Sequence, residues 1–284
     1  MKQPAEISQQ IEKLKQHGII VDDYIYAVNL LQSVNYYRLR GYWLTFNLND
    51  ASKPVFIKNI ADVYNFDTEL KAILWRMIEP IEIKIRTQFA YHLSTITKNA
   101  LAHKDTNLFK NENQFNKAMS SINAEIKRAK RNKVSFVAHN INKYSDLPIW
   151  AVVELISFGC LSKLCGNLKT EYLNPISKEF GINNHYFKSW SRHLGEVRNV
   201  CAHHNRLYNR SMILPAKLFK EDKQYISQKQ FPTFIVLSKL YRNFKQNEYS
   251  GAVSQLEKLF KQYPSVSLEP IGFPENWQEV LKNS

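Results

Sequence analysis

Glycine and proline are scarce in this chain, which has 8 Gly and 10 Pro among 284 residues. Because these residues end helices and form turns, their scarcity favours long helices over many short strands. Hydrophobic residues make up 44% of the sequence and aromatic residues 13%, which argues against a disordered chain and allows a sizeable core. We find no internal repeat and no low-complexity linker, so we predict one compact unit over residues 1–284.

Cysteine is also rare. The three cysteines, Cys160, Cys165 and Cys201, are an odd number in a long chain and do not resemble a disulfide framework. Cys201 lies close to His203 and His204, but the segment lacks a clear fourth ligand for a zinc ion. We therefore predict no bound metal and no cofactor.

The chain lacks a long hydrophobic run. Its most apolar stretch, residues 148–161, is too short to span a bilayer and contains Glu154. The first ten residues, MKQPAEISQQ, lack the apolar segment of a secretory signal. These features predict a cytoplasmic protein with no membrane partner.

Acidic residues are outnumbered, with 25 Asp and Glu against 39 Lys and Arg and a formal net charge of +14. Such a surface attracts polyanions, with nucleic acid as the first candidate and an anionic membrane face as the second. The sequence contains no G-x-x-x-x-G-K-[ST], G-x-G-x-x-G or G-x-S-x-G motif. P-loop nucleotide hydrolysis, dinucleotide redox chemistry and serine hydrolase chemistry therefore lack support.

Apolar residues at helical spacing predict helices over residues 4–17, 23–34, 60–94, 147–164, 185–208, 231–244 and 251–263, and one more that ends in 125–133. Pro80 is expected to kink or divide the third of these helices. The aromatic-rich connection before that helix is expected to be irregular, and residues 96–117 to be mostly loop. Residues 267–284 are predicted to form a packed loop and a short terminal helix.

The stretch EVRNVCAHHNRLYNR, residues 196–210, brings an arginine and two adjacent histidines to the end of a helical pattern. Arg198 offers a permanent cation and a planar fork of donors that fits a phosphate, and histidine exchanges protons near neutral pH. These groups suit RNA cleavage, in which a 2′-hydroxyl attacks the adjacent phosphate, arginine holds the developing charge and imidazole protonates the leaving 5′-oxygen. The competing interpretation is a solvated helical face without chemistry.

The spacing of these residues is weak evidence by itself, because Arg86 and His92 also satisfy it. On a straight helix Arg198 and His203 point roughly 140° apart, so a site needs a bend, a neighbouring helix or a second copy of the chain. Arg86 with His92 is a candidate second half-site. The alternative is that Glu82, one turn earlier, pairs with Arg86 on the helix surface.

The phrase RNVCAHHNRLYN resembles the R-N-x-x-x-H core of HEPN ribonuclease domains, as it occurs in the bacterial Abi family of abortive infection proteins, the AbiD and AbiF group. Four other stretches are similar to that family and occur in the same order: NYYRLRGYW (35–43), YNFDTELKAIL (64–74), IEPIEIKIRTQFAYHLS (78–94) and PIWAVVELISFGCLSKL (148–164). The resemblance covers about residues 5–215. It leaves residues 216–284 as a C-terminal helical extension.

This resemblance implies an all-α fold, a HEPN-like helical bundle with additional helices, and a growth-arresting ribonuclease toxin of phage defence. It makes Arg198 the motif arginine, Asn199 the polar residue after it and His203 the motif histidine, with His204 as a neighbour. The implied partners are an RNA substrate, a noncoding RNA or protein antitoxin that silences the toxin, and a second copy of the chain as a homodimer.

Two other segments are candidates for RNA binding. Five basic residues near the end of a predicted helix form either a phosphate-tracking patch or a solvated helix end that suits the helix dipole: Lys127, Arg128, Lys130, Arg131 and Lys133. Arg206, within the motif, is a further candidate. In NYYRLRGYW, aromatic residues alternate with Arg38 and Arg40, a pattern that suits stacking on bases. We expect Tyr37, Tyr42 and Trp43 to lie in the core instead.

The sequence leads to a metal-independent RNA endonuclease as the first hypothesis, in part because no carboxylate cluster accompanies Arg198 and His203 to hold metal ions. The alternative is a non-catalytic RNA-binding protein that captures a small or viral RNA. A DNA-binding regulator lacks support, because the sequence has no recognisable helix-turn-helix with a short glycine turn.

Overall fold

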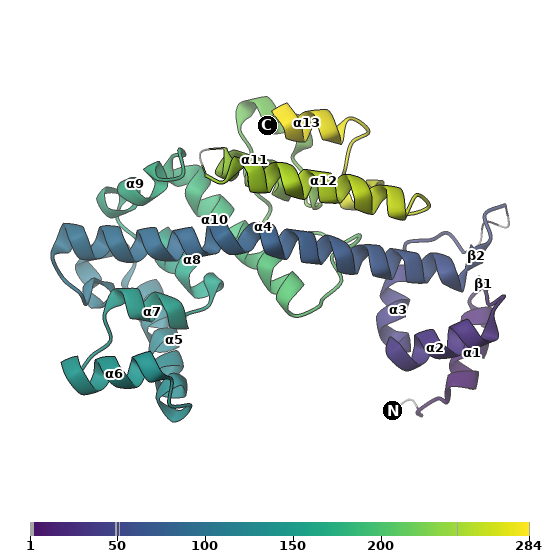
Figure 1. Ribbon diagram of the computed structural model, residues 1–284, viewed down its shortest axis with the longest axis horizontal. Coiled ribbons are helices and arrows are strands. Elements are labelled where there is room, and N and C mark those ends of the chain that lie inside the picture. Colours follow the sequence, from purple (N-terminus) through teal and green to yellow (C-terminus); the bar gives the residue numbers. More distant parts are fainter. Residues whose placement is uncertain (1–2, 49, 51, 243, 284) are drawn as a thin grey trace.

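One long helix forms the axis of the molecule. The computed structural model describes residues 3–48, 50, 52–242 and 244–283. Helix α4, Ile57–Thr97, has 41 residues and crosses most of the width of the molecule in Figure 1. Four helices pack along it: α7, Ile149–Leu155; α9, Thr170–Lys178; α10, Asn184–Ala202; and α12, Gln246–Gln262. Apart from one pair of two-residue strands and an isolated bridge, the regular elements of the described residues are helices, so the predicted all-α class is confirmed.

Pro80 lies inside α4, and the helix is not divided there. A proline in a helix interior removes one backbone hydrogen bond and costs about 3 kcal/mol. Met77, Ile78 and Ile81 are all buried beside it, and the packing of these side chains offsets that cost. Burial on both sides of the proline, which periodicity does not reveal, keeps α4 in one piece.

The N-terminal helices pack at one end of α4. Helices α1, Ile7–Gln16, and α2, Tyr24–Ser33, confirm the first two predicted helices, and Asp23 caps α2 by accepting the Tyr26 N–H. Strands β1, Ile19–Ile20, and β2, Val55–Phe56, pair in parallel with Ile19 opposite Val55. This pair ties the loop after α1 to the start of α4.

The aromatic-rich connection predicted to be irregular is instead a helix, α3, Tyr36–Trp43. Its Asn35 cap accepts the Tyr37 N–H, and the apolar side chains of Tyr42 and Trp43 are buried as predicted. The prediction that Tyr37 lies in the core is wrong, and the residue is 79% exposed. On a helix Tyr37 and Tyr42 point roughly 140° apart, so both cannot face the core.

The segment between α4 and α10 contains more helices than the sequence pattern indicates. After the short 3₁₀ helices η1, Ala102–Lys104, and η2, Thr106–Leu108, helix α5 already begins within the stretch predicted to be loop. The predicted helix over 147–164 is divided, because Ser157 accepts the Cys160 N–H and so starts a new helix. The remaining helices are α5, Glu112–Arg131; α6, Ser135–Tyr144; α7, Ile149–Leu155; α8, Phe158–Asn167; and α9, Thr170–Lys178. Helices α6 and α9 were not predicted.

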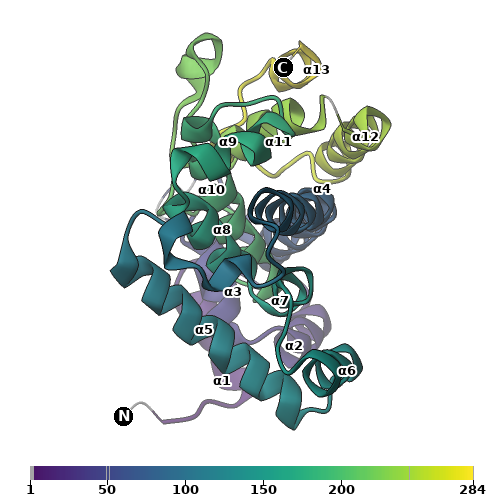
Figure 2. The same ribbon diagram turned by 90° about the vertical axis from the view of Figure 1, so that its left-hand side faces the viewer.

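The C-terminal helices cover α4 on the side opposite α7, as the end-on view of α4 in Figure 2 shows. Helix α10, Asn184–Ala202, leads through η3, Lys220–Tyr225, to α11, Phe231–Tyr241, and α12, Gln246–Gln262. The predicted extent of α11 to residue 244 includes Asn243, which lies outside the described residues. The predicted packed loop and short terminal helix are confirmed by η4, Glu269–Ile271, and α13, Trp277–Asn283.

A buried histidine joins α10 to these C-terminal helices. His193 lies 2.7 Å through Nδ1 from the Leu214 carbonyl oxygen and 2.8 Å through Nε2 from the Thr233 hydroxyl. A carbonyl only accepts, so Nδ1 donates and Nε2 accepts from Thr233. Burial lowers the pKa of His193, which keeps the ring neutral and this pairing intact.

His103 predicts a loss of stability in mild acid. The ring is 1% exposed, and burial, with the neighbouring Lys104, lowers its pKa to about 4. Because the unfolded chain takes up this proton near pH 6.5, the stability present above that pH is lost as the pH falls toward 4. From pH 7.5 to 5 we expect His103 to contribute a loss of about 2 kcal/mol in urea unfolding.

Two histidine variants separate the contribution of His103 to the unfolding free energy from that of other titrating groups. His103→Leu should narrow the difference in unfolding free energy between pH 7.5 and 5 by about 2 kcal/mol, whereas His139→Leu, at an exposed position, should leave it unchanged. Equal pH dependence in both variants would contradict the assignment.

Candidate active site

Helix α10 fixes the position of the motif arginine. Its apolar stripe, Phe187, Trp190, Leu194 and Val197, is buried, as predicted from the spacing. Arg198 follows the stripe and turns toward α4, with 28% of its side chain exposed. The guanidinium is therefore held at the junction of two helices and still reaches solvent.

Glu82 and Trp75 of α4 hold the Arg198 side chain. Nε of Arg198 lies 3.2 Å from Oε2 of Glu82, and the guanidinium carbon lies 4.9 Å from the centre of the Trp75 ring. A charge-assisted hydrogen bond and a cation–π contact both favour one orientation. Among the described residues, Nη1 and Nη2 have no hydrogen-bond partner. These two nitrogens remain free to bind an anion.

The other oxygen of Glu82 pairs with Arg86. Oε1 of Glu82 accepts from Nε of Arg86 at 3.2 Å and also from Nη2. Nη1 of Arg86 donates to the carbonyl oxygens of Val153 and, at 2.8 Å, Ile156, at the C-terminal end of α7. Arg86 thus caps α7, while the buried Glu82 bridges the two arginines rather than lying on the helix surface.

His92, the partner suggested for Arg86, lies two turns further along α4. Its Nε2 is 3.5 Å from Oε1 of Glu179, and its side chain is 16% exposed. The structure gives the Arg86 guanidinium a role in holding α4 to α7. A second half-site formed by Arg86 and His92 stays a prediction.

Helix α10 ends before the histidine pair, not at Tyr208 as the pattern predicted. The His204 N–H donates to the Cys201 carbonyl at 3.1 Å, and the Asn205 N–H donates to the Val200 carbonyl at 3.0 Å. This is the Schellman arrangement, with His204 at φ 52° in the left-handed position that glycine usually takes. The turn contains no glycine, so the residue pattern does not predict it.

This turn exposes both histidine side chains. His203 is the C-terminal cap residue of α10, and its N–H donates to the Asn199 carbonyl at 3.0 Å. The side chains of His203 and His204 are exposed and that of Asn199 is half-buried. The motif therefore presents two imidazoles to solvent just beyond the helix that carries Arg198.

A buried carboxylate holds the chain after the turn. Asp67, on α4, is fully buried and accepts the N–H of Leu207 at 3.2 Å, the N–H of Tyr208 at 2.7 Å and the Tyr42 hydroxyl at 2.7 Å. Nζ of Lys71 lies 3.0 Å from Oδ2 of Asp67. Burial, together with the Asp67 charge, raises the pKa of Tyr42, so its hydroxyl stays a donor.

Arginines on both sides complete this support. Nη1 of Arg38, on α3, donates to the His204 carbonyl, and Nη1 of Arg206 donates to the Gly41 carbonyl. Lys71 also donates to the Asn205 carbonyl at 3.3 Å. Arg206, predicted to bind RNA, is thus half-buried and engaged within the protein, and three segments distant in the sequence meet at one turn.

A groove with a volume of 720 Å³ opens between α3, α4 and this turn. Its described lining residues are Arg38, Tyr64, Thr68, Lys71, Ala72, Trp75, Arg76, Cys201, Ala202 and His204. His204 lines the groove and His203 is not among these residues, although the family pattern favours His203. Burial raises the pKa of Cys201 to about 12, so its thiol is inert packing.

A family comparison covers the elements that build this site. The model of the Abi-like protein family matches residues 29–209, well over half of the chain. The chain belongs to the Abi-like protein family. The matched range contains α3, α4, α10 and the turn, and it ends one residue after Tyr208. Comparison with curated proteins and with solved structures gave no match. The family suggests a role in abortive-infection phage defence.

The predicted basic patch of this Abi-like protein lies at the end of α5 and in the turn after it. Lys127, Arg128, Lys130, Arg131 and Lys133 are all exposed, and Arg128 pairs with Glu125 at 3.1 Å. Figure 1 places α5 and α6 at the end of the molecule opposite α1 and α2. RNA binding by this patch stays a prediction.

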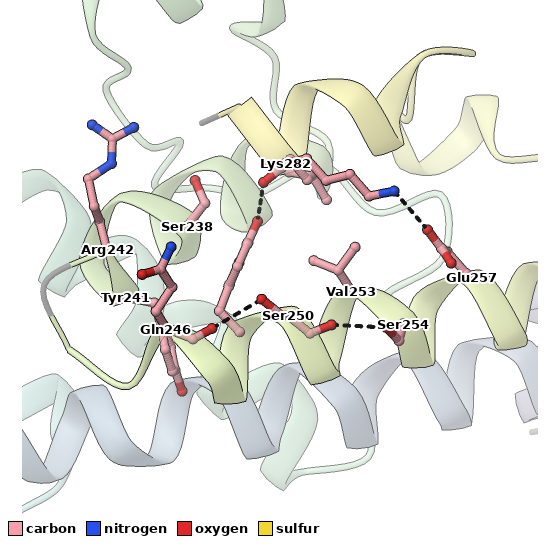
Figure 3. Close-up of a pocket in the computed structure, with 11 residues that line it drawn as sticks. Ser238, Tyr241, Arg242, Gln246, Ser250, Val253, Ser254, Glu257 and Lys282 are labelled. Carbon is pink, nitrogen blue, oxygen red and sulfur yellow. Dashed lines mark hydrogen bonds and ion pairs between the residues drawn. The ribbon is translucent and has the colours of Figure 1, made fainter.

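Another hollow, of 270 Å³, lies between α11, α12 and α13 (Figure 3). The hydroxyls of Ser250 and Ser254 donate to carbonyls of their own helix, and Tyr249 donates to the Leu281 carbonyl at 3.3 Å. Lys282 pairs with Glu257 at 3.8 Å across its rim. These contacts join α13 to α12 in the part of the Abi-like protein beyond the family match.

The described residues contain no group of three or more His, Cys, Asp or Glu side chains arranged to hold a metal ion. No helix among them is long and apolar enough to cross a membrane.

Proposed function

We propose that this Abi-like protein is a metal-independent, HEPN-type RNA endonuclease that acts as a growth-arresting toxin of phage defence. The observation that carries the proposal is the fixed guanidinium of Arg198. Glu82 and Trp75 orient it while Nη1 and Nη2 stay available for a phosphate, and the same helix ends five residues later with exposed histidines. A planar cation and an imidazole are what transesterification of RNA requires.

The proposed reaction is attack by a ribose 2′-hydroxyl on the adjacent phosphorus. A bond forms from the 2′-oxygen to phosphorus, and the bond from phosphorus to the 5′-oxygen breaks. Arg198 stabilises the charge that develops on the phosphoryl oxygens. His203 exchanges the proton with the reacting oxygens as acid or base. The products are a 2′,3′-cyclic phosphate and a 5′-hydroxyl.

Two copies of the chain are proposed to form the complete site. Arg198 lies on α10 and His203 is the cap residue that follows this helix, five positions later, so helical spacing separates their directions by roughly 140°. Ile83 lines the small hollow that contains Arg198 and is 56% exposed, so an apolar side chain borders the arginine at the surface. A two-fold homodimer would bring the histidine of one chain to the arginine of the other. A noncoding RNA or a protein antitoxin is the proposed silencing partner.

The test is cleavage of a single-stranded RNA by the purified protein. We expect cutting to persist in EDTA, to leave 2′,3′-cyclic phosphate or 3′-phosphate ends, and to fail on DNA or on RNA blocked at the 2′-position. Metal dependence would reject this chemistry. Tight binding without cutting would favour the non-catalytic RNA-binding protein instead.

A further inference from the structure

The groove beside the motif turn has walls suited to a nucleotide. Tyr64 and Trp75 supply aromatic surface from α4, and Tyr64 is fixed by an edge-to-face contact with the buried Tyr42, at 5.5 Å between ring centres. Arg38 and Arg76 are exposed and add positive charge, with Nη1 of Arg38 already engaged by the His204 carbonyl. Aromatic faces beside arginines are the usual means of holding single-stranded nucleic acid without sequence preference.

The groove is positively charged, and its basic side chains differ in how free they are to bind an anion. None of the described lining residues is a carboxylate. Lys71 is neutralised by Asp67 at 3.0 Å, so it contributes little to binding an anion. Arg76 is exposed, its Nε lies 3.4 Å from the Ala72 carbonyl of its own helix, and it forms no ion pair among the described residues. Arg76 is therefore the most available cation of the groove.

Trp75 connects the groove to Arg198. Its side chain lines the groove, and it also lines the small hollow of 130 Å³ where Arg198 lies 4.9 Å from its ring centre. A strand that places one phosphate on Arg198 would therefore continue past Trp75 into the groove. The groove volume of 720 Å³ falls in the range of roughly 300–1,000 Å³ that is usual for small-ligand sites.

The geometry points to this groove as the binding site for a nucleotide that flanks the cleaved phosphate of single-stranded RNA. This inference rests on the proposed function. The base lies against Tyr64 and Trp75, and Arg76 holds the flanking phosphate. His204 contacts the same nucleotide from the motif turn, which separates its role from that of His203 at the reacting phosphate.

The experiment measures binding apart from cleavage. The full-length protein is titrated with a fluorescently labelled 2′-O-methyl RNA 12-mer, which cannot be cut, at several salt concentrations. Loss of one phosphate contact lowers the slope of log affinity against log salt by about 0.7 for a single strand. We expect that change for Arg76→Ala. We expect no change for Arg192→Ala, which removes the same charge from an exposed position on α10 outside the groove.

A second measurement tests the aromatic wall. The wild type should bind the 12-mer about tenfold more tightly than an abasic strand of equal length, because base–aromatic stacking is lost. Tyr64→Leu should shrink this difference. Equal salt slopes for Arg76→Ala and Arg192→Ala would overturn the groove assignment and direct the search to the basic end of α5. That measurement stands even if Tyr64→Leu fails to fold.

The result is separable from the outcome for the proposed function. Groove-dependent binding with no cleavage of unmodified RNA would support the groove and reject the endonuclease. Cleavage of unmodified RNA with equal salt slopes for the two arginine variants would reject the groove and support the endonuclease.

Discussion

His203→Ala is expected to lower the rate of RNA cleavage by about 10² to 10⁴-fold, because it removes the proposed acid or base from the reacting phosphate. The fold should survive, since the His203 side chain is exposed and only its backbone N–H contributes to the end of α10. RNA affinity should also survive, because most of it comes from phosphate contacts. The measurement is single-turnover cleavage of a labelled single-stranded RNA, with and without EDTA.

Matched variants sharpen this test. Arg198→Ala should reduce cleavage in the same way, and Arg198→Lys should rescue poorly, because lysine lacks both the planar fork and the Nε that donates to Glu82. His204→Asn should preserve the turn, since asparagine tolerates the left-handed backbone at this position. Its effect on the chemical step should be smaller, because the proposed acid or base is His203. Unchanged cutting by His203→Ala would indicate a contaminating nuclease or another site.

The same two variants reveal how the site is assembled. If each site takes Arg198 from one chain and His203 from the other, mixing Arg198→Ala with His203→Ala gives heterodimers with one intact site. An equal mixture should recover about a quarter of the wild-type rate, since half of the dimers are mixed and each carries one of two sites. No recovery after subunit exchange, verified by pull-down of one tagged variant with the other, would reject the shared site.

Asp67→Asn is expected to destabilise the protein by about 3 to 5 kcal/mol in urea unfolding, because it removes a buried negative charge and leaves the buried Lys71 unpaired. Asparagine also offers fewer acceptor sites to the N–H groups of Leu207 and Tyr208 and to the Tyr42 hydroxyl. Relative to the wild type, hydrogen exchange should speed up more at the amides of Leu207 and Tyr208 than at amides elsewhere in the core.

The double variant Asp67→Asn with Lys71→Met distinguishes charge from hydrogen bonding. It should recover part of the lost stability, because no unpaired charge then remains buried. A loss below 1 kcal/mol for Asp67→Asn alone would show that Asp67 does not hold the turn.

The sequence predicted those parts of the site that depend on neighbours along one helix. The stripe through Trp190 and Leu194 gave the buried face of α10, and the family phrase marked Arg198. Contacts between distant segments gave no such signal. Glu82 is one turn from Arg86, which suggested a pair, but nothing in the spacing showed that it also reaches Arg198, 116 residues away.

The missed elements have similar physical causes. Helix α3 is short and rich in aromatic residues, so its sequence shows no clear helical pattern. Its packing against α4, which buries Tyr42, is seen only in the three-dimensional structure. The end of α10 was placed six residues too late because the left-handed position is taken by His204 instead of glycine. Local patterns determine the helix faces, and tertiary contacts determine where the helices end.

Because α4 is one continuous helix, it tolerates substitutions better than insertions or deletions. Asp67, Trp75 and Glu82 hold the turn, the groove and Arg198, and all three project from this one helix. Deleting or inserting a single residue between them would rotate one contact set by about 100° and shift it by about 1.5 Å relative to the others. Natural variation within this stretch should therefore consist of substitutions that keep the helical register, with changes of length confined to the loops at either end.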